Sequence, residues 1–226
     1  MDMRIAGTGK IPEGEYNKIK LSGSTRLFGL VKCASFSSAG TSRGESIECN
    51  GELRVSGKSA FFGNAKAKII RVSGSFSCGG ETEAEEISIY GKAKCVKSVK
   101  CKSIKVFGSL STEGDIHAES VKAAGAVNCK SVNAESVEIQ VDKSMNIGKI
   151  SGSKITVERK RISILIKRRL TASSIEGDEI FLEYVTCPFV KGRSVKIGKG
   201  CKIGLVQYSE EFSASPKAKI ENTEKR

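Results

Sequence analysis

Glycine recurs in this chain every 17 residues, and this period constrains the fold more than any other feature. The glycines in register are Gly23, Gly40, Gly57, Gly74, Gly91, Gly108 and Gly125. Apolar residues stand four and two positions before most of them, as Ile70 and Val72 do before Gly74. Apolar side chains at i and i+2 are typical of a strand with one buried face. A period of this length predicts a repeat protein in which each unit stacks on the next.

The remainder of the repeat is also patterned. Small residues such as Cys33, Asn50, Ala67 and Ala84 stand ten positions after the glycines, where we expect them to be buried. The 17 residues therefore divide into three short strands separated by tight corners, at which glycine accepts positive φ without steric cost. We predict an all-β fold: a single-stranded β-helix, or solenoid, with about 17 residues per turn and a triangular cross-section.

The register weakens after the last of these glycines. Ala134 supplies the small residue one position early, which predicts a slip of one residue there. We predict one solenoid domain over residues 16–212, regular to about residue 141 and irregular and basic after about residue 155. Residues 1–15 are expected to form a flexible N-terminal tail, and residues 213–226 a charged C-terminal tail.

Several segments resemble the bactofilins, a polymer-forming family of bacterial cytoskeletal proteins. The segments are Val72-Ser73-Gly74-Ser75, Val106-Phe107-Gly108-Ser109 and the closing stretch 195–204, and the resemblance covers about residues 18–208. It implies a right-handed β-helix that assembles into filaments without nucleotide. It also implies a scaffolding role in cell shape, envelope organisation or motility, with the protein itself and client proteins as partners.

The ends of a solenoid predict self-assembly independently of this resemblance. A terminal strand exposes unpaired N–H and C=O groups, which form a template for another chain. The first turn is apolar and the far end is rich in aromatic residues, so both ends are candidates for an interface. The alternative is that these side chains plug and cap the solenoid. The candidate interface residues are Ile19, Leu21, Leu27, Phe28, Leu30, Phe181, Leu182, Tyr184, Phe189, Tyr208 and Phe212.

A net charge of +13 favours an anionic partner, or serves solubility alone. Outward cations stand three positions before five of the repeat glycines: Lys20, Arg54, Arg71, Lys105 and Lys122. A second cluster flanks a predicted strand containing Ile162, Ile164 and Ile166: Arg159, Lys160, Arg161, Lys167, Arg168 and Arg169. These residues are candidate contacts for an anionic membrane surface, an acidic protein or nucleic acid. Nucleic acid is disfavoured, because aromatic residues are not interleaved with the second cluster.

The chain holds little material for catalysis or metal binding. It has one His and no Cys-x2-Cys pair, so a zinc site is disfavoured and no cofactor is expected. His117 is expected to be a surface residue or a histidine with its hydrogen bonds satisfied, and not a catalytic base. Five cysteines occupy predicted inward positions and are expected to be free thiols: Cys33, Cys78, Cys95, Cys101 and Cys129. Cys78 and Cys95 are expected to lie one above the other, where oxidation would allow a disulfide.

Three functions follow from these observations. The leading one is a bactofilin-like, non-enzymatic scaffold subunit that polymerises end to end and takes no small-molecule substrate. The second is a basic β-helical adaptor for an anionic partner. The third is an acyltransferase of the hexapeptide-repeat kind, suggested by the local echo of Ile197-Gly198 in Ile203-Gly204. No apolar run reaches about 18 residues and the N-terminus has no apolar leader, which predicts a cytoplasmic protein with the membrane surface as a second location.

Overall fold

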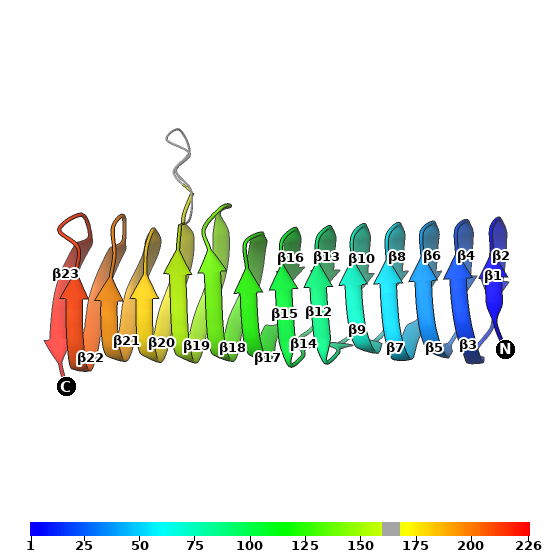
Figure 1. The fold of residues 1–226 in the computed structure, drawn as a ribbon, viewed down its shortest axis with the longest axis horizontal. Coiled ribbons are helices and arrows are strands. Elements are labelled where there is room, and N and C mark those ends of the chain that lie inside the picture. The colour runs from blue at the N-terminus through cyan, green and yellow to red at the C-terminus, as the bar shows by residue number, and fades with distance from the viewer. Residues whose placement is uncertain (160–167) are drawn as a thin grey trace. The chain divides into compact units, whose positions relative to one another are not determined.

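The computed structural model describes residues 1–159 and 168–226, and it confirms the predicted all-β solenoid with about 17 residues per turn. The chain divides into two compact units, Met1–Gly114 and Asp115–Arg226, called unit 1 and unit 2 below. Both consist of parallel β-strands that follow one another as successive turns (Figure 1). The described residues contain no helix.

Unit 1 consists of strands two to ten residues long, and a four-residue strand recurs in every turn (Figure 1). Its strands are β1 (Met3–Ile5), β2 (Thr8–Ile11), β3 (Gly14–Leu21), β4 (Ser24–Leu27), β5 (Leu30–Ser38), β6 (Thr41–Gly44), β7 (Ser46–Val55), β8 (Lys58–Phe61), β9 (Ala65–Val72), β10 (Ser75–Cys78), β11 (Thr82–Glu83), β12 (Glu86–Ile89), β13 (Lys92–Cys95), β14 (Val99–Lys100), β15 (Ser103–Val106) and β16 (Ser109–Thr112). The predicted three strands per turn are separate in β10, β11 and β12, whereas β5, β7 and β9 each join two of them.

The ladder of unit 1 keeps equivalent residues above one another. One inward column consists of Ile19, Phe36, Leu53, Ile70, Ile87 and Ile104, and each pairs with the next at an offset of 17. All six are at most 3% exposed. The core also includes edge-on aromatic contacts: the ring centroids of Phe36 and Phe61 lie 6.0 Å apart. Burial of one aliphatic residue per turn at each position supplies the hydrophobic stabilisation.

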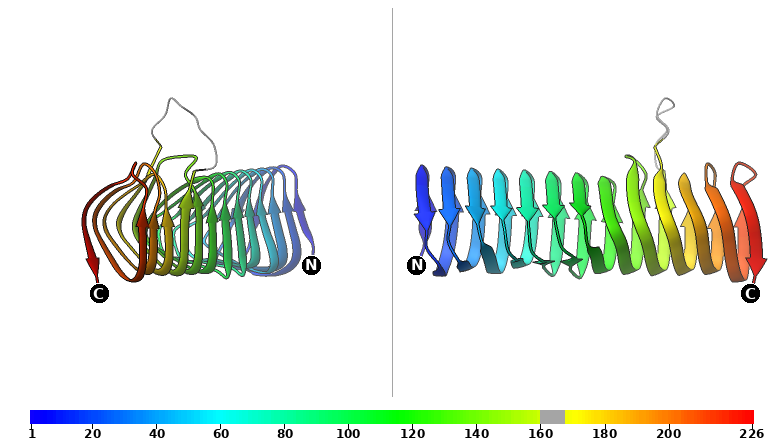
Figure 2. Two further views of the ribbon diagram at one scale, coloured as in Figure 1. Left: turned by 60° about the vertical axis from the view of Figure 1, so that its left-hand side comes forward. Right: turned by 180° about the vertical axis from the view of Figure 1, so that it is seen from behind.

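Unit 2 has longer strands and less regular turns (Figure 2). Its strands are β17 (Asp115–Ala123), β18 (Ala126–Gln140), β19 (Met145–Glu158), β20 (Leu170–Leu182), β21 (Val185–Ile197), β22 (Lys202–Ala214) and β23 (Lys219–Lys225). Ala118 pairs with Ala134 and Val121 with Val137, an offset of 16 that confirms the predicted slip. The predicted strand with Ile162, Ile164 and Ile166 lies outside the described residues.

Both expected tails contain strands instead. Residues 1–15 hold β1 and β2, and Met3 and Ile5 pair with Ile19 and Leu21. Within residues 213–226, β23 pairs in parallel with β22 over Lys219–Lys225. The physical reason at the N-terminal side is that Ile5 and Ile11 continue the inward apolar positions by one turn. The 16-residue offset of this turn hid it from a search for a strict 17-residue period.

One inward position also differs from the expected residue. Asn50 was expected inside, but it is exposed, and Cys49 is buried in its place. Cys49 pairs with Cys33 on one side and Ala67 on the other, and the register shifts immediately after it on β7. A β-bulge, which adds one residue to one strand, accounts for the change of face.

The repeat glycines are required for close approach and not for positive φ. A Cβ added to Gly74 would lie 2.0 Å from the carbonyl oxygen of Gly57, and one added to Gly91 would lie 2.0 Å from that of Gly74. Among the described glycines, positive φ in the left-handed range occurs only at Gly14, Gly29 and Gly200. The corner glycines therefore let consecutive turns touch backbone to backbone.

We expect Gly74→Ala to destabilise the protein by at least about 1–3 kcal/mol, the usual cost of overpacking, because the backbone of the preceding turn cannot move freely. Thermal unfolding followed by circular dichroism measures the loss. Gly7→Ala is the matched control, since a Cβ at Gly7 meets no atom within 4 Å. Equal effects of the two substitutions would contradict the close-approach explanation.

Candidate assembly edges and charged faces

No strand of the described residues pairs with the outer edges of β1 and β2. In the described residues β1 pairs only with β3, and β2 only with β4. The carbonyls of Gly7 and Ile11 accept hydrogen bonds from the amides of Ser24 and Phe28 at 3.0 and 2.9 Å. Because successive residues of a strand turn their backbone groups to opposite edges, the N–H and C=O groups of Thr8 and Lys10 point away from β4. This edge offers an unpaired ladder.

The outer edge of β23 in unit 2 is mostly polar. β23 has the sequence KIENTEK, and six of its seven residues are exposed. Gln207 on β22 is buried and its amide donates a 2.7 Å hydrogen bond to Glu224. β23 pairs with β22 only as far as Tyr208, so residues 211–214 of β22 have β21 on one side and no described strand on the other. Charged side chains on an edge strand oppose further pairing, which leaves residues 211–214 as the open segment.

The N-terminal assembly candidates do not lie on an edge. Ile19, Leu21 and Leu27 are 1–2% exposed and belong to the core, because β1 and β2 pair with the strands that carry them. Leu30 is half-buried. Phe28 is 39% exposed and stands at the corner after β4. The interface predicted for the first turn is therefore wrong for the three buried residues, since another turn covers them.

Most C-terminal candidates lie inside unit 2. Phe181 and Leu182 on β20 and Phe189 on β21 have paired strands on both sides. Tyr184 is half-buried with a φ of 55°, and the Arg159 guanidinium lies 4.9 Å from its ring centroid. Leu182 is buried in the core, which supports the alternative interpretation for this residue, and the other three are half-buried residues that do not lie on an open strand edge.

The remaining two candidates lie near the open segment. The rings of Tyr208 and Phe212 stack with centroids 5.2 Å apart, and both residues are half-buried. Tyr208 pairs with Lys225 of β23, whereas Phe212 pairs with Val195 and belongs to the open segment 211–214. Of the predicted C-terminal interface, Phe212 is the residue that the structure places on an open edge.

The first predicted cation stripe is partly neutralised. Arg54 and Arg71 are exposed and directly paired, as expected, but both contact Glu52, at 3.0 and 3.4 Å. Lys122 contacts Glu138 at 2.9 Å. Lys20 and Lys105 are exposed, and the described residues give neither an ion-pair partner. Exposed pairs of this kind contribute little stability, but they reduce the charge available to an anion.

The second predicted cluster is described in part. Lys160, Arg161 and Lys167 lie outside the described residues. The Arg168 guanidinium donates a hydrogen bond to the Asp142 carbonyl, and that of Arg169 donates one to Gly200 at 3.3 Å. With Arg159 over the ring of Tyr184, all three described arginines make contacts within unit 2. Their role in the fold is thereby established, and their role toward an anion stays a prediction.

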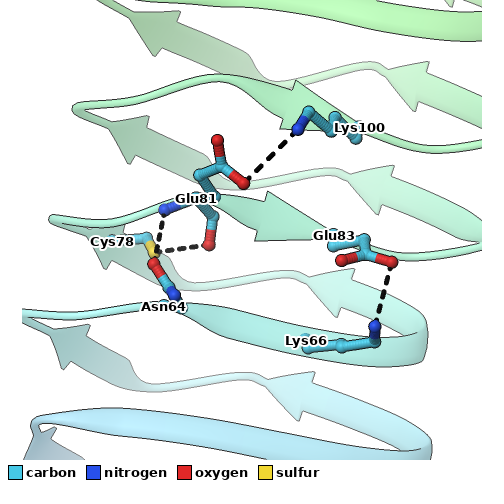
Figure 3. Close-up of polar contacts among 6 residues, drawn as sticks. All are labelled: Asn64, Lys66, Cys78, Glu81, Glu83 and Lys100. Carbon is cyan, nitrogen blue, oxygen red and sulfur yellow. Dashed lines mark hydrogen bonds and ion pairs between the residues drawn. The ribbon is translucent and has the colours of Figure 1, made fainter.

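Another surface of unit 1 carries charges that alternate in sign from turn to turn. The paired outward residues are Glu15, Lys32, Glu48, Lys66, Glu83 and Lys100. Lys66 contacts Glu83 at 3.1 Å, and Lys100 contacts Glu81 at 3.4 Å (Figure 3). The Glu81 amide donates to the Asn64 side chain at 2.9 Å in the same region. Opposite charges in direct register stabilise the ladder and fix its alignment.

The sequence analysis missed the most uniform charged surface. Five of the seven strands in one ladder carry Lys or Arg, and none of the seven contains Asp or Glu: β2, β4, β6, β8, β10, β13 and β16. Their outward residues stand one and three positions after the repeat glycines, and this pattern was available in the sequence.

The cysteines form one close pair that the sequence analysis also missed. All eight are free thiols, and the sulfur atoms of buried Cys33 and Cys49 lie 3.1 Å apart. The hydrogen bond with Cys49 lowers the pKa of Cys33, against the effect of burial, and the same bond and burial raise the pKa of Cys49. Cys78 and Cys95 are directly paired, as expected. However, Cys78 donates to the Gly63 carbonyl, and Cys95 accepts from Thr82.

The remaining sequence features to locate are the single histidine, any metal-binding group and any membrane-spanning helix. His117 is exposed and pairs with Asn133 across the ladder. Among residues 1–159 and 168–226, no group of three or more His, Cys, Asp and Glu side chains is arranged to hold a metal ion. The same residues include no helix that is long and apolar enough to cross a bilayer.

We expect the thiol oxidant diamide to join Cys33 to Cys49 before any other pair, because their sulfur atoms already touch across adjacent turns. The two thiols lose two protons and two electrons, which the azo group takes up. Peptide mapping under non-reducing conditions detects the product, and Cys49→Ser is the control that removes it. A Cys78–Cys95 disulfide formed first would contradict this prediction.

No protein-family model and no solved structure matches the chain. Two curated proteins of Bacillus subtilis (strain 168) are similar to part of it. The uncharacterized protein YhbF is 35% identical over 81 residues, which are 35% of this chain and 34% of that protein. The uncharacterized protein YhbE is 41% identical over 56 residues, which are 25% of this chain and 24% of that protein. The chain thus spans about a third or less of the length of these relatives.

Proposed function

We propose that this protein is a non-enzymatic β-solenoid scaffold subunit, similar in role to the bactofilins, that assembles with copies of itself and holds client proteins. The observation that carries this proposal is the open outer edge of β1 and β2. This edge combines unpaired backbone groups with inward apolar residues, Ile5 and Ile11, in the first described turn. An edge of this kind is a template for another strand.

The open segment 211–214 of β22 supplies a second, different contact. Charges on β23 oppose pairing along the rest of that edge, so association there is restricted to the segment that contains Phe212. A contact between two different surfaces leaves a free surface of each kind on every growing assembly. Such a heterologous contact extends into an open filament when the rotation between copies does not close a ring.

A basic adaptor for an anionic partner is the second candidate function. It is favoured by the carboxylate-free strands β2, β4, β6, β8, β10, β13 and β16. Assembly uses backbone groups at strand edges, whereas these cations are side chains on a strand face. The two functions are therefore compatible in one molecule.

Lys10→Pro tests the assembly edge. The N–H of Lys10 points away from β4, so proline removes an outward donor while the bonds between β2 and β4 are kept. We expect the untagged native protein to form filaments without nucleotide at physiological salt, as seen by negative-stain electron microscopy. We expect Lys10→Pro to give particles of one or two copies under the same conditions.

Lys10→Ala is the matched control, because it removes the same charge but keeps the N–H, and it should form filaments like the native protein. Circular dichroism and thermal unfolding check that the proline variant is folded. Two results would overturn the proposal. One is a monodisperse monomer of the native protein in sedimentation at high concentration, and the other is unchanged filaments in the folded proline variant.

A further inference from the structure

The ladders of unit 1 differ in the signs of the charges that they present to solvent. The ladder through β3, β5, β7, β9, β12 and β15 includes Glu52 and Glu86 beside its cations. The alternating column described above carries equal numbers of both signs. Only the ladder through β2, β4, β6, β8, β10, β13 and β16 has cations and no carboxylates. We call the outward surface of these strands the cationic face.

The cationic face is a flat ladder of basic and hydroxyl side chains. All of its cations are exposed: Lys10, Arg26, Arg43, Lys58, Lys92 and Lys94. Hydroxyl residues fill most of the other outward positions: Thr8, Ser24, Thr41, Ser75, Ser77, Ser109 and Ser111. Seven strands spaced about 4.8 Å apart make the face about 29 Å long.

Like charges meet directly at one end of this face. Lys10 pairs with Arg26, and Arg26 pairs with Arg43, in three consecutive turns. Directly opposed like charges destabilise a ladder. Within residues 1–159 and 168–226, none of the six cations of the face has an ion-pair partner. By contrast, Arg54 and Arg71, which are also opposed, share Glu52.

Exposed apolar side chains border the cationic face at both corners. Phe28, Phe62 and Val96 follow β4, β8 and β13 and are 39%, 72% and 42% exposed. Tyr90 and Phe107 precede β13 and β16 and are 59% and 49% exposed, with rings stacked at 5.1 Å. These five are all of the large hydrophobic side chains that the described residues expose, apart from Met1.

We propose that the cationic face docks on an anionic lipid bilayer. Lys and Arg next to an anionic leaflet bind its phosphates, and a flat face lets cations from many turns reach one surface together. Hydroxyl groups add hydrogen-bond donors for the same oxygens. Aromatic residues favour the boundary between headgroups and acyl chains, and here they stand at the two borders of the face.

The position of the aromatic residues favours a bilayer over nucleic acid. Single-stranded nucleic acid requires aromatic rings among the cations, so that bases stack while phosphates are bound. Here the outward positions of the seven strands hold no aromatic side chain. Cations at the centre with aromatic residues at the borders fit a continuous plane of headgroups above a hydrocarbon layer.

Vesicle flotation tests this proposal on the full chain. Flotation is chosen because self-assembled protein sinks in a density gradient while vesicles rise. We expect the native protein to float with vesicles of phosphatidylglycerol and phosphatidylcholine, and to stay at the bottom with pure phosphatidylcholine. We expect the triple variant Arg26→Glu, Arg43→Glu and Lys58→Glu to lose at least about tenfold in partitioning, since each cation near the surface contributes several-fold.

The matched control reverses three exposed cations on the neighbouring ladder: Lys18→Glu, Lys20→Glu and Lys105→Glu. It changes the net charge by the same amount. Lys18 and Lys20 pair with serines in the following turn and Lys105 with a serine in the preceding turn. None of the three has an ion-pair partner among the described residues, so no described ion pair is broken. We expect the control to keep most of the native binding. An equal loss in both triple variants would show that net charge, and not this face, decides binding, and would overturn the proposal.

Two further measurements test the aromatic borders and the choice of lipid over nucleic acid. Phe62→Ser with Tyr90→Ser should weaken flotation most at 0.5 M salt, where charges are screened and the aromatic contribution remains. Unchanged flotation of this variant would contradict the role of the borders. Fluorescence anisotropy with a DNA duplex tests the other polyanion, and tight DNA binding without vesicle binding by the native protein would overturn the assignment to lipid.

Discussion

The parallel hydrogen-bonded ladder between consecutive turns is the constraint on which the rest of the structure depends. It places each repeat position directly above its equivalent, so that one residue type is multiplied into a column. At the corners the turns meet so closely that a Cβ at Gly57 would lie 2.1 Å from the Gly40 carbonyl. A residue choice that is harmless once therefore becomes a steric or electrostatic problem when it recurs at every turn.

Charge shows how the chain resolves this problem. One column alternates Glu and Lys, which turns stacking into attraction, and Glu52 separates the opposed Arg54 and Arg71. The fold can thus neutralise a column when stability alone decides. On the cationic face it does not, and Lys10, Arg26 and Arg43 remain stacked. Repulsion retained beside neutralised columns is the physical reason for assigning this face an external anion.

The fold was predictable because the strongest signal, the glycine period, arises from the inter-turn contact itself. What the period could not reveal were departures of a single residue. The bulge on β7 places Cys49, and not Asn50, at the inward position. The 16-residue offset of the first turn concealed β1 and β2. That hidden turn buries Ile19 and Leu21, which composition alone suggested for an exposed end. The sequence suggested Arg159 and Arg169 as contacts for an anion. It could not show their contacts with Tyr184 and Gly200, because these residues are distant in sequence.

Edges and faces of a solenoid recognise different things, and this separation makes the two proposals reinforce each other. Strand edges offer backbone groups that only another strand can satisfy, while outward side chains are repeated identically along the ladder. Docking through a few cations per copy is weak and sensitive to salt. When copies are joined, each further contact becomes intramolecular, and overall binding rises without any new interaction. A polymer of this chain would therefore hold a membrane that a single copy leaves readily, which couples assembly to localisation through mass action alone.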